Sequence, residues 1–183
     1  MTALPPGHSW CLALTHHAHA PEEFRVDGFI ARGQRGVVAS ASEVGSSGRR
    51  HAIKKILRDT LCTLAMRRQV QAEREALCSV HHPCICELHA TYKNSRAIYL
   101  VMELCDGPQL YSALQHSGGL QEEQLRLCAA CVVGALGALH EHGWLYRDVK
   151  AENFVFVSSG ALKLVDCGLA TLVPLVDERC FTR

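Results

Sequence analysis

The stretch "LYRDVKAENFVF", Leu145–Phe156, places an aspartate, a lysine and an asparagine between apolar flanks. Asp148, Lys150 and Asn153 follow one another at spacings of two and three residues, which neither a single helix face nor a single strand face accommodates. The pattern therefore predicts a loop that directs a carboxylate, an ammonium group and a carboxamide toward one point. A charged surface turn is the alternative, and the rest of the chain has to decide between the two.

Composition limits the classes of protein to consider. The chain has 183 residues, of which 48% are hydrophobic and 20% are charged, which is ordinary for one or two globular units. Nineteen Lys and Arg residues against eighteen Asp and Glu residues give a formal net charge of +1. This balance gives no reason to expect binding to nucleic acid or to a membrane surface.

The ten cysteines are expected to be reduced. Residues 1–21 show neither a basic start nor a continuous apolar stretch, so no signal peptide is predicted and a cytoplasmic location is expected. The longest apolar run, Cys128–Leu139, is too short to span a bilayer. It predicts a buried helix.

Two Cys and His clusters raise the alternative of a metal site. Cys128 and Cys131 form a C-x-x-C pair, and "HHPCIC", His81–Cys86, gathers two histidines and two cysteines. Each cluster lacks an evident second pair of ligands. Cys128 and Cys131 lie one helical turn apart among Ala and Val, and we interpret them as small core residues. "HHPCIC" is interpreted as a turn broken by Pro83 and followed by a short strand, with ligation as the alternative.

Alternating apolar residues predict a strand-rich first half. Strands are expected at residues 24–38, 37–44, 51–57, 85–92 and 97–104. Residues 59–80 instead follow a helical period, which places Val70, Glu73, Leu77 and Val80 on one face. Because Glu73 lies on this inward face, its carboxylate needs a partner.

The second half is expected to be mainly helical. Helices are predicted at residues 109–116 and 121–142, with Gly143 as the C-terminal stop of the second. The segments "FVFV" and "ALKLV" then predict a short hairpin that leads to "DCG", Asp166–Gly168.

Four separated motifs occur in the order in which phosphoryl-transfer enzymes of one class carry them. "ARGQRGVV", Ala31–Val38, matches the phosphate-covering pattern G-x-G-x-x-G-x-V except at Ala31. "HAIK" ends at Lys54, "YRDVKAEN" has a catalytic-loop pattern, and "DCG" stands where D-F-G is found in such proteins. The glycine motif alone is weak evidence, because a hairpin also uses glycines. The order of all four favours a phosphoryl-transfer site.

On these motifs the chain resembles eukaryotic protein kinases of the AGC group, where tyrosine often replaces the histidine of H-R-D. "KLVDCGLA" and "LCAACV" are most similar to cyclic-nucleotide-dependent kinases, cGMP-dependent ones in particular. The resemblance covers about residues 24–183 and stops inside the activation segment, so a fragment of a longer chain is expected.

The resemblance implies an α+β, bilobal protein-kinase fold. Residues 1–23 would be a tail, 24–104 a complete N-lobe with a five-stranded antiparallel sheet and helix C, 105–108 the hinge or linker, and 109–183 a truncated helical C-lobe.

The implied activity is ATP-dependent phosphorylation of Ser or Thr in a protein or peptide substrate, with Mg²⁺ as the metal. Lys54, oriented by Glu73, would contact the phosphates, Asp148 would accept the substrate proton, and Lys150 would steady the transferring phosphate. Asn153 and Asp166 would hold the metal. The residues expected to bind nucleotide are Gly33, Gly36, Val38, Ala52, Lys54, Met102, Glu103, Cys105 and Val155.

The sequence departs from the family pattern at Cys167, where the family has a phenylalanine that stacks with Leu77, Leu88 and Tyr146. This change favours an alternative: a pseudokinase-like module that binds nucleotide or a partner without turnover. A kinase acting on small molecules is a further alternative. Phosphorylation of Thr182, read through Arg147, and a regulatory domain or subunit outside this chain are also expected from the resemblance.

Overall fold

The computed structural model describes residues 24–33, 36–45, 48–116 and 119–173 of the chain. The contacts divide it into two compact units, which are described separately. Unit 1 comprises Met1–Thr63 and Leu88–Leu104, and unit 2 comprises Leu64–Glu87 and Cys105–Arg183. The predicted helix of residues 59–80 thus falls mainly in unit 2, whereas the resemblance implies a place for it within the lobe of residues 24–104.

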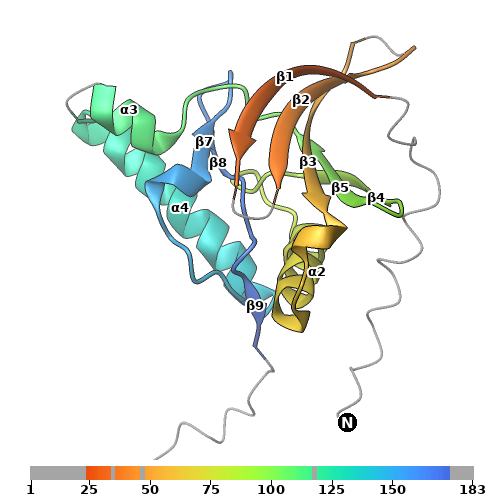
Figure 1. Cartoon of the computed structure of the whole chain (residues 1–183). Coiled ribbons are helices and arrows are strands. Elements are labelled where there is room, and N and C mark those ends of the chain that lie inside the picture. The colour runs from red at the N-terminus through yellow and green to blue at the C-terminus, as the bar shows by residue number, and fades with distance from the viewer. Residues whose placement is uncertain (1–23, 34–35, 46–47, 117–118, 174–183) are drawn as a thin grey trace, which may run out of the picture. The chain divides into compact units, whose positions relative to one another are not determined.

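Unit 1 is built on a five-stranded sheet with the order β1-β2-β3-β5-β4, in which every pair of neighbours is antiparallel (Figure 1). Its strands are β1 (Phe24–Arg32), β2 (Val37–Glu43), β3 (Arg50–Leu57), β4 (Leu88–Lys93) and β5 (Ala97–Glu103). The five predicted strands are therefore present. The fourth begins three residues later than expected, because Ile85 makes only an isolated bridge to Leu164 in unit 2.

Strand alternation gives this sheet two different faces. Val38 is the cross-strand partner of Lys54, and Ala52 is the partner of Met102, so these four side chains share one face. Their neighbours in sequence, which include Ile53 and the exposed Lys55, point to the opposite face.

The glycine-rich turn between β1 and β2 needs glycine at position 36. The Gly33 N–H donates to the Gly36 carbonyl at 2.9 Å, which closes the turn. A Cβ atom on Gly36 would collide with the carbonyl oxygen of Lys55 on β3. The glycine therefore permits a close approach of two backbones.

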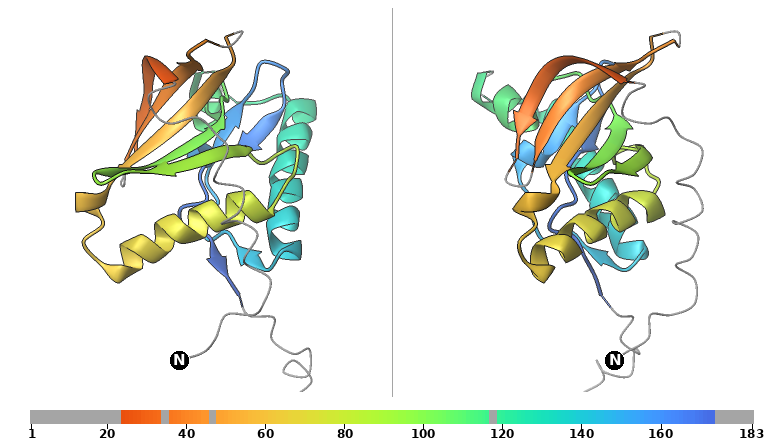
Figure 2. Two further views of the ribbon diagram at one scale, coloured as in Figure 1. Left: turned by 90° about the vertical axis from the view of Figure 1, so that its right-hand side faces the viewer. Right: turned by 45° about the vertical axis from the view of Figure 1, so that its right-hand side comes forward.

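In its described residues, unit 2 combines three α-helices with short strand pairs (Figure 2). The helices are α2 (Leu64–Ser79), α3 (Leu110–His116) and α4 (Glu122–Glu141), and the pairs are β6 (Trp144–Leu145) with β9 (Thr171–Leu172) and β7 (Phe154–Phe156) with β8 (Leu162–Leu164). The predicted hairpin before "DCG" is confirmed. The β6–β9 pair, with two residues in each strand, is too short to show an alternating pattern in the sequence.

Helix α2 starts later than predicted. A 3-10 turn, η3 (Arg58–Thr60), occupies the expected first turn, and the α-helix begins at Leu64. The inward face is as predicted, because Val70, Glu73 and Leu77 are all buried. The indole Nε1 of Trp144 donates to the Ser79 hydroxyl at 3.0 Å, which ties the end of this helix to β6.

Helix α4 has clear signals at both ends. Gln121 and Gln124 form a reciprocal capping box at the N-terminus. Gly143, at φ 77°, reverses the chain after the C-terminus, as predicted. None of the helices in the described part of the chain is long and apolar enough to cross a membrane.

The segment after β5 is fixed to β7 by backbone hydrogen bonds. The Gly107 N–H donates to the Phe156 carbonyl at 2.9 Å, and the Phe156 N–H donates to the Pro108 carbonyl at 3.0 Å. The Ser158 N–H donates to the Asp106 carboxylate at 2.9 Å. The expected linker is therefore an ordered part of unit 2.

We expect Gly107→Ala to destabilise the protein by about 1–3 kcal/mol, since the new Cβ would lie 2.6 Å from the Phe156 carbonyl oxygen. A thermal melt measures the effect. The matched control is Gly137→Ala in α4, where the added methyl group meets nothing within 4 Å and a helical alanine is favoured by about 1 kcal/mol. Equal melting temperatures for the two variants would contradict the close packing at Gly107.

Candidate active site

The loop that follows α4 brings its three polar side chains together as the sequence predicts. The Lys150 ammonium group lies 2.8 Å from Asp148 Oδ2. Asn153 Nδ2 lies 2.8 Å from the same carboxylate oxygen and 2.9 Å from the Asp148 carbonyl oxygen. A 3-10 turn, η4 (Ala151–Asn153), turns the chain so that residues at unequal spacing converge.

Tyr146 connects this loop to the "DCG" segment. Its hydroxyl accepts a hydrogen bond from Asn153 Nδ2 at 2.8 Å and donates one to the Asp166 carbonyl at 2.9 Å. The side chain is 1% exposed, and burial raises the pKa of Tyr146 well above its usual value, with the nearby Cys167 adding to the effect. The hydroxyl therefore remains a proton donor at all physiological pH values.

Asp166 and Asn153 are held side by side by the backbone. The Val165 N–H donates to the Asn153 carbonyl at 2.9 Å, and Asp166 Oδ1 accepts the Gly168 N–H at 2.8 Å. The hydrogen bonds of the Asn153 amide described above all use Nδ2, so its Oδ1 atom is the one suited to a cation. One carboxylate and one amide oxygen are hard ligands of the kind that Mg²⁺ selects, usually together with water and substrate phosphates.

Lys150 keeps its positive charge throughout the neutral range. The hydrogen bond that Lys150 donates to the Asp148 carboxylate is the main cause that raises the pKa of Lys150, with the charges of Asp148, Glu152 and Asp166 acting in the same direction. The ammonium group is partly exposed, so this pair contributes little to the free energy of unfolding. The consequence of the pair for the site is that a cation is held next to the Asp148 carboxylate.

Arg147 has a left-handed backbone, with φ 65°, which is uncommon for a residue with a long side chain. Its guanidinium Nε donates to the Leu169 carbonyl at 2.9 Å. This bond fixes the arginine against the segment that follows "DCG". Such strained positions cluster at functional sites. Thr182, the residue expected to act through Arg147, lies outside the described residues.

Cys167 is fully buried, and it contributes, after burial itself, to the raised pKa of Tyr146. Leu77 is also buried in unit 2, whereas Leu88 belongs to unit 1. The thiol is therefore part of a closed core and does not face solvent.

The candidate residues of unit 1 share the sheet face defined above. Val38, Ala52, Lys54 and Met102 lie on it, and Lys54 is only 8% exposed although it is a lysine. Glu103 ends β5, and Gly33 and Gly36 form the turn between β1 and β2. Lys54 is therefore buried among small and apolar neighbours, whereas the adjacent Lys55 is exposed.

The remaining candidates belong to unit 2. Glu73 is fully buried on α2, and Val155, 9% exposed, pairs with Lys163 in the β7–β8 hairpin. Val155 also bridges to Gln109, so it lies beside the ordered linker that contains Cys105. Since Lys54 and Glu73 belong to different units, their pairing stays a prediction.

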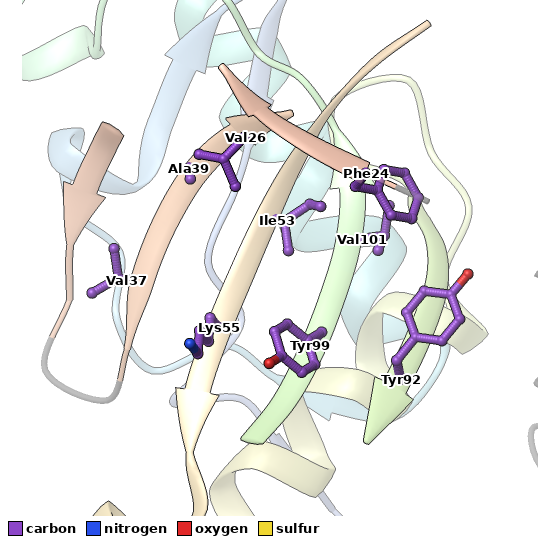
Figure 3. Close-up of a pocket in the computed structure, with 9 residues that line it drawn as sticks. All are labelled: Phe24, Val26, Val37, Ala39, Ile53, Lys55, Tyr92, Tyr99 and Val101. Atoms are coloured by element: carbon purple, nitrogen blue, oxygen red, sulfur yellow. The ribbon is translucent and has the colours of Figure 1, made fainter. Parts of the chain in front are cut away.

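A pocket in unit 1 lies on the other face of the sheet (Figure 3). Its lining is almost entirely apolar or aromatic and consists of Phe24, Val26, Val37, Ala39, Ile53, Lys55, Tyr92, Tyr99 and Val101. By strand alternation, this pocket is separate from the face of Val38, Ala52 and Lys54. It is therefore not the nucleotide site expected from the sequence.

Unit 1 also contains a buried polar cluster around His51 that no sequence motif predicts. His51 is 2% exposed, and its two ring nitrogens lie 2.7 Å from Glu43 Oε1 and 3.0 Å from His89 Nδ1. No sequence spacing signals this cluster, because its members come from three strands. Within the residues that the structure describes, no group of three or more His, Cys, Asp or Glu side chains can hold a metal ion.

Comparison with known proteins identifies the family. The model of the protein kinase domain matches residues 24–182. Human cGMP-dependent protein kinase 2 is 35% identical over 119 residues, which cover 65% of this chain and 16% of that protein. The cGMP-dependent protein kinase of Toxoplasma gondii is 32% identical over 149 residues, which cover 81% of this chain and 15% of that protein.

Human ribosomal protein S6 kinase alpha-3 is 30% identical over 166 residues, which cover 87% of this chain and 22% of that protein. The chain thus spans less than a quarter of the length of these relatives. They are AGC kinases, which confirms the resemblance drawn from "YRDVKAEN" and "KLVDCGLA". Because the family model matches most of the chain, this chain belongs to the protein kinase domain family.

Proposed function

We propose that this chain carries the nucleotide-binding and catalytic groups of a serine/threonine protein kinase. The observation that carries the proposal is the continuous network from Lys150 through Asp148, Asn153 and Tyr146 to Asp166. A plain charged turn would not need a fully buried tyrosine to join it to a second acidic segment. Protein kinase domains use ATP and a divalent metal ion.

The network suits transfer of the γ-phosphoryl group to a hydroxyl. Asp148 would orient the substrate hydroxyl and accept its proton, and Lys150, 2.8 Å from that carboxylate, would neutralise charge on the transferring phosphate. In phosphoryl transfer the protein contributes mainly by positioning the reactants and by stabilising charge, and it does little covalent chemistry. The fixed geometry of this loop supplies both.

Asn153 and Asp166 would hold the metal, for which we propose Mg²⁺ because both offer oxygen ligands. A bound divalent ion would neutralise the phosphates of ATP there. Lys54 would bind the phosphates, with Glu73 as its partner. Val38, Ala52, Met102 and Val155 would pack on the purine, and Gly33, Gly36, Glu103 and Cys105 would contribute backbone contacts.

The runner-up function, a pseudokinase-like module, is not favoured. It would explain Cys167, but it gives no reason for Asp148, Lys150, Asn153 and Asp166 to be retained in one ordered network. The substrate is proposed to be a protein or peptide hydroxyl. Regulatory domains outside this chain, and a cytoplasmic location, stay predictions.

Nucleotide binding tests the proposal directly. At saturating Mg-ATP, about 100 times its Kd, we expect the melting temperature to rise by about 5–10 °C. Lys54→Met and Asp166→Asn should each remove most of this rise, since each removes a charge placed on the phosphates or the metal. Lys55→Met is the matched control, because Lys55 lies on the opposite face of β3. An unchanged shift in both site variants would disprove the site assignment.

A further inference from the structure

Strand register sets the floor of the apolar pocket in unit 1 (Figure 3). The floor consists of two rows of side chains that are paired across the sheet. One row is Ala39, Ile53 and Val101, and the other is Val37, Lys55, Tyr99 and Tyr92. Because β2, β3, β5 and β4 are neighbours in this order, the two rows form one surface across four strands.

The two edge strands of the sheet approach each other over this floor. Phe24 lies on β1 and Tyr92 lies on β4, which are opposite edges of the sheet, yet their ring centroids are only 6.5 Å apart. Val26 on β1 lines the pocket as well. The sheet therefore encloses a hollow of about 150 Å³, a volume that can hold a benzene-sized apolar group.

A buried polar cluster supports the wall that Phe24 forms. The Phe24 ring meets the His51 imidazole edge-on, with centroids 5.5 Å apart and an interplanar angle of 87°. The two ring nitrogens of His51 are in turn held by Glu43 and His89, at 2.7 and 3.0 Å. The wall is thus formed before any ligand binds, which lowers the entropic cost of binding.

The lining of the pocket suits a ligand with uncharged aromatic or aliphatic side chains. Eight of the nine lining residues are aliphatic or aromatic, and Lys55 is the ninth. The Lys55 ammonium group lies 6.0 Å from the Tyr99 ring centroid, a distance at which the ring attracts the cation. Val26 is 67% exposed and Val101 is 2% exposed, so apolar surface runs from the rim to the floor. Such a hollow is typical of a binding surface.

The chain itself carries a segment of this chemistry close to the pocket. Residues 1–23 lie outside the described residues and lead directly into Phe24, which is a wall of the pocket. Within them, the five residues of "WCLAL", Trp10–Leu14, are all apolar, and residues 1–21 contain no Asp, Glu, Lys or Arg. Nine residues, 15–23, join Leu14 to Phe24, and an extended tether of this length spans up to about 30 Å.

We propose that Trp10–Leu14 docks in this pocket of its own chain, with the Trp10 indole in the hollow beside Phe24 and Tyr92. Aromatic rings favour edge-to-face and offset contacts of the kind that these two walls offer. The short tether gives the segment a millimolar effective concentration at the pocket, so a contact too weak for a free peptide is sufficient. In an extended segment, Leu12 and Leu14 would point to the same side as Trp10 and cover the floor.

This inference does not rest on the proposed kinase activity. The pocket lies on the sheet face opposite Val38, Ala52 and Lys54, and the segment would contact neither the nucleotide residues nor the catalytic loop. The variants used below should therefore leave the thermal shift caused by Mg-ATP unchanged, so the two proposals can fail separately.

Tryptophan fluorescence of the full chain measures docking. Of the two tryptophans, Trp144 is 3% exposed and its indole is bonded to Ser79, so acrylamide quenches mainly Trp10. We expect Trp10 to be shielded in the native chain. Val26→Asp places a carboxylate at the rim of the apolar pocket, which should weaken docking by about tenfold or more and raise the quenching toward that of a synthetic peptide of residues 5–20.

Val133→Asp is the matched control, because it makes the same substitution at a valine of equal exposure, 68%, on α4. It should leave the quenching of Trp10 at the native value. Trp10→Phe gives the signal of Trp144 alone, which is subtracted from the others.

Photo-cross-linking identifies what the segment contacts. Replacement of Trp10 by benzoylphenylalanine should give, on irradiation, a link within one chain to tryptic peptides that carry pocket residues, namely residues 26–32 or 97–126. The yield should be independent of protein concentration. It should fall in the Val26→Asp background and persist in the Val133→Asp background.

Three results would overturn the proposal. The first is equal quenching of Trp10 in the native chain, in Val26→Asp and in the free peptide. The second is a set of links confined to unit 2. The third is a cross-linked dimer whose yield rises with concentration, which would assign the pocket to a second copy of the chain.

A variant on the segment side keeps the test valid if Val26→Asp folds poorly. Leu12→Asp alters no described residue, so it should retain the native melting temperature while it exposes Trp10 to acrylamide and lowers the yield of the link. A Leu12→Asp chain with native stability and native shielding of Trp10 would also disprove docking through this apolar run.

Discussion

Asp148→Asn is expected to lower phosphoryl transfer to a peptide by about 10²- to 10⁴-fold, the usual range for loss of a general base. The amide oxygen can still accept the Asn153 hydrogen bond, so the loop should keep its shape. The change removes the proton acceptor and the anionic partner of Lys150 at 2.8 Å. Nucleotide binding should therefore be nearly unaffected while transfer is lost.

This experiment compares initial rates at saturating Mg-ATP with a serine-containing basic peptide, in the longest chain that carries this segment. Glu122→Gln is the matched control, since it makes the same change at an exposed carboxylate whose partner is Arg126 in the next turn of α4. A transfer rate for Asp148→Asn within threefold of the native rate would exclude Asp148 as the base. A parallel loss of the nucleotide-dependent thermal shift would instead indicate that the variant disturbs the site as a whole.

Much of this site could be predicted from the sequence because its chemistry is concentrated in short motifs. Asp148, Lys150 and Asn153 lie within six residues, so their convergence required only a tight turn. Strand alternation likewise requires Lys54 and Lys55 to point to opposite faces, and the resemblance implies that Lys54 is the one in the site. Glu73 could be assigned to the inward face of α2 from the helical period alone.

Contacts between segments that are distant in sequence could not be predicted in this way. The cluster of His82 with Gly134 on α4 depends on how the loop after α2 is anchored to β8, and the cluster of His51 with Glu43 and His89 depends on sheet register. Neither cluster has an internal spacing that identifies it. The late start of α2 has a local cause, since the 3-10 turn at Arg58–Thr60 takes up residues that fit a helical period equally well.

The largest expected loss of stability comes from Asn153→Ala. Asn153 is 6% exposed, and its Nδ2 atom lies within hydrogen-bond distance of the Tyr146 hydroxyl, the Asp148 carbonyl and the Asp148 carboxylate. Removal of the amide leaves the buried Tyr146 hydroxyl and the half-buried oxygens of Asp148 without this donor, which costs about 2–4 kcal/mol. Thermal unfolding should show a melting temperature lower by about 4–16 °C.

Tyr146→Phe separates the energy of this network from the energy of packing. The ring is retained, and the variant removes only the hydroxyl that accepts from Asn153 and donates to Asp166. The expected cost is about 1–3 kcal/mol. Tyr111→Phe in α3 is the matched control, because that side chain is 46% exposed, and its effect should be below about 0.5 kcal/mol.

The double variant decides whether the two residues act as one unit. If Tyr146 and Asn153 stabilise the same network, the combined loss should be smaller than the sum of the single losses by about 0.5–3 kcal/mol, since the shared hydrogen bond is broken only once. Chemical denaturation of the four proteins measures this coupling. Additive losses would show that the hydrogen bond between Asn153 and the Tyr146 hydroxyl contributes no energy of its own. The Tyr146 hydroxyl would then hold Asp166 through its own bond to the Asp166 carbonyl, independently of Asn153, together with the bonds of Val165 and Gly168.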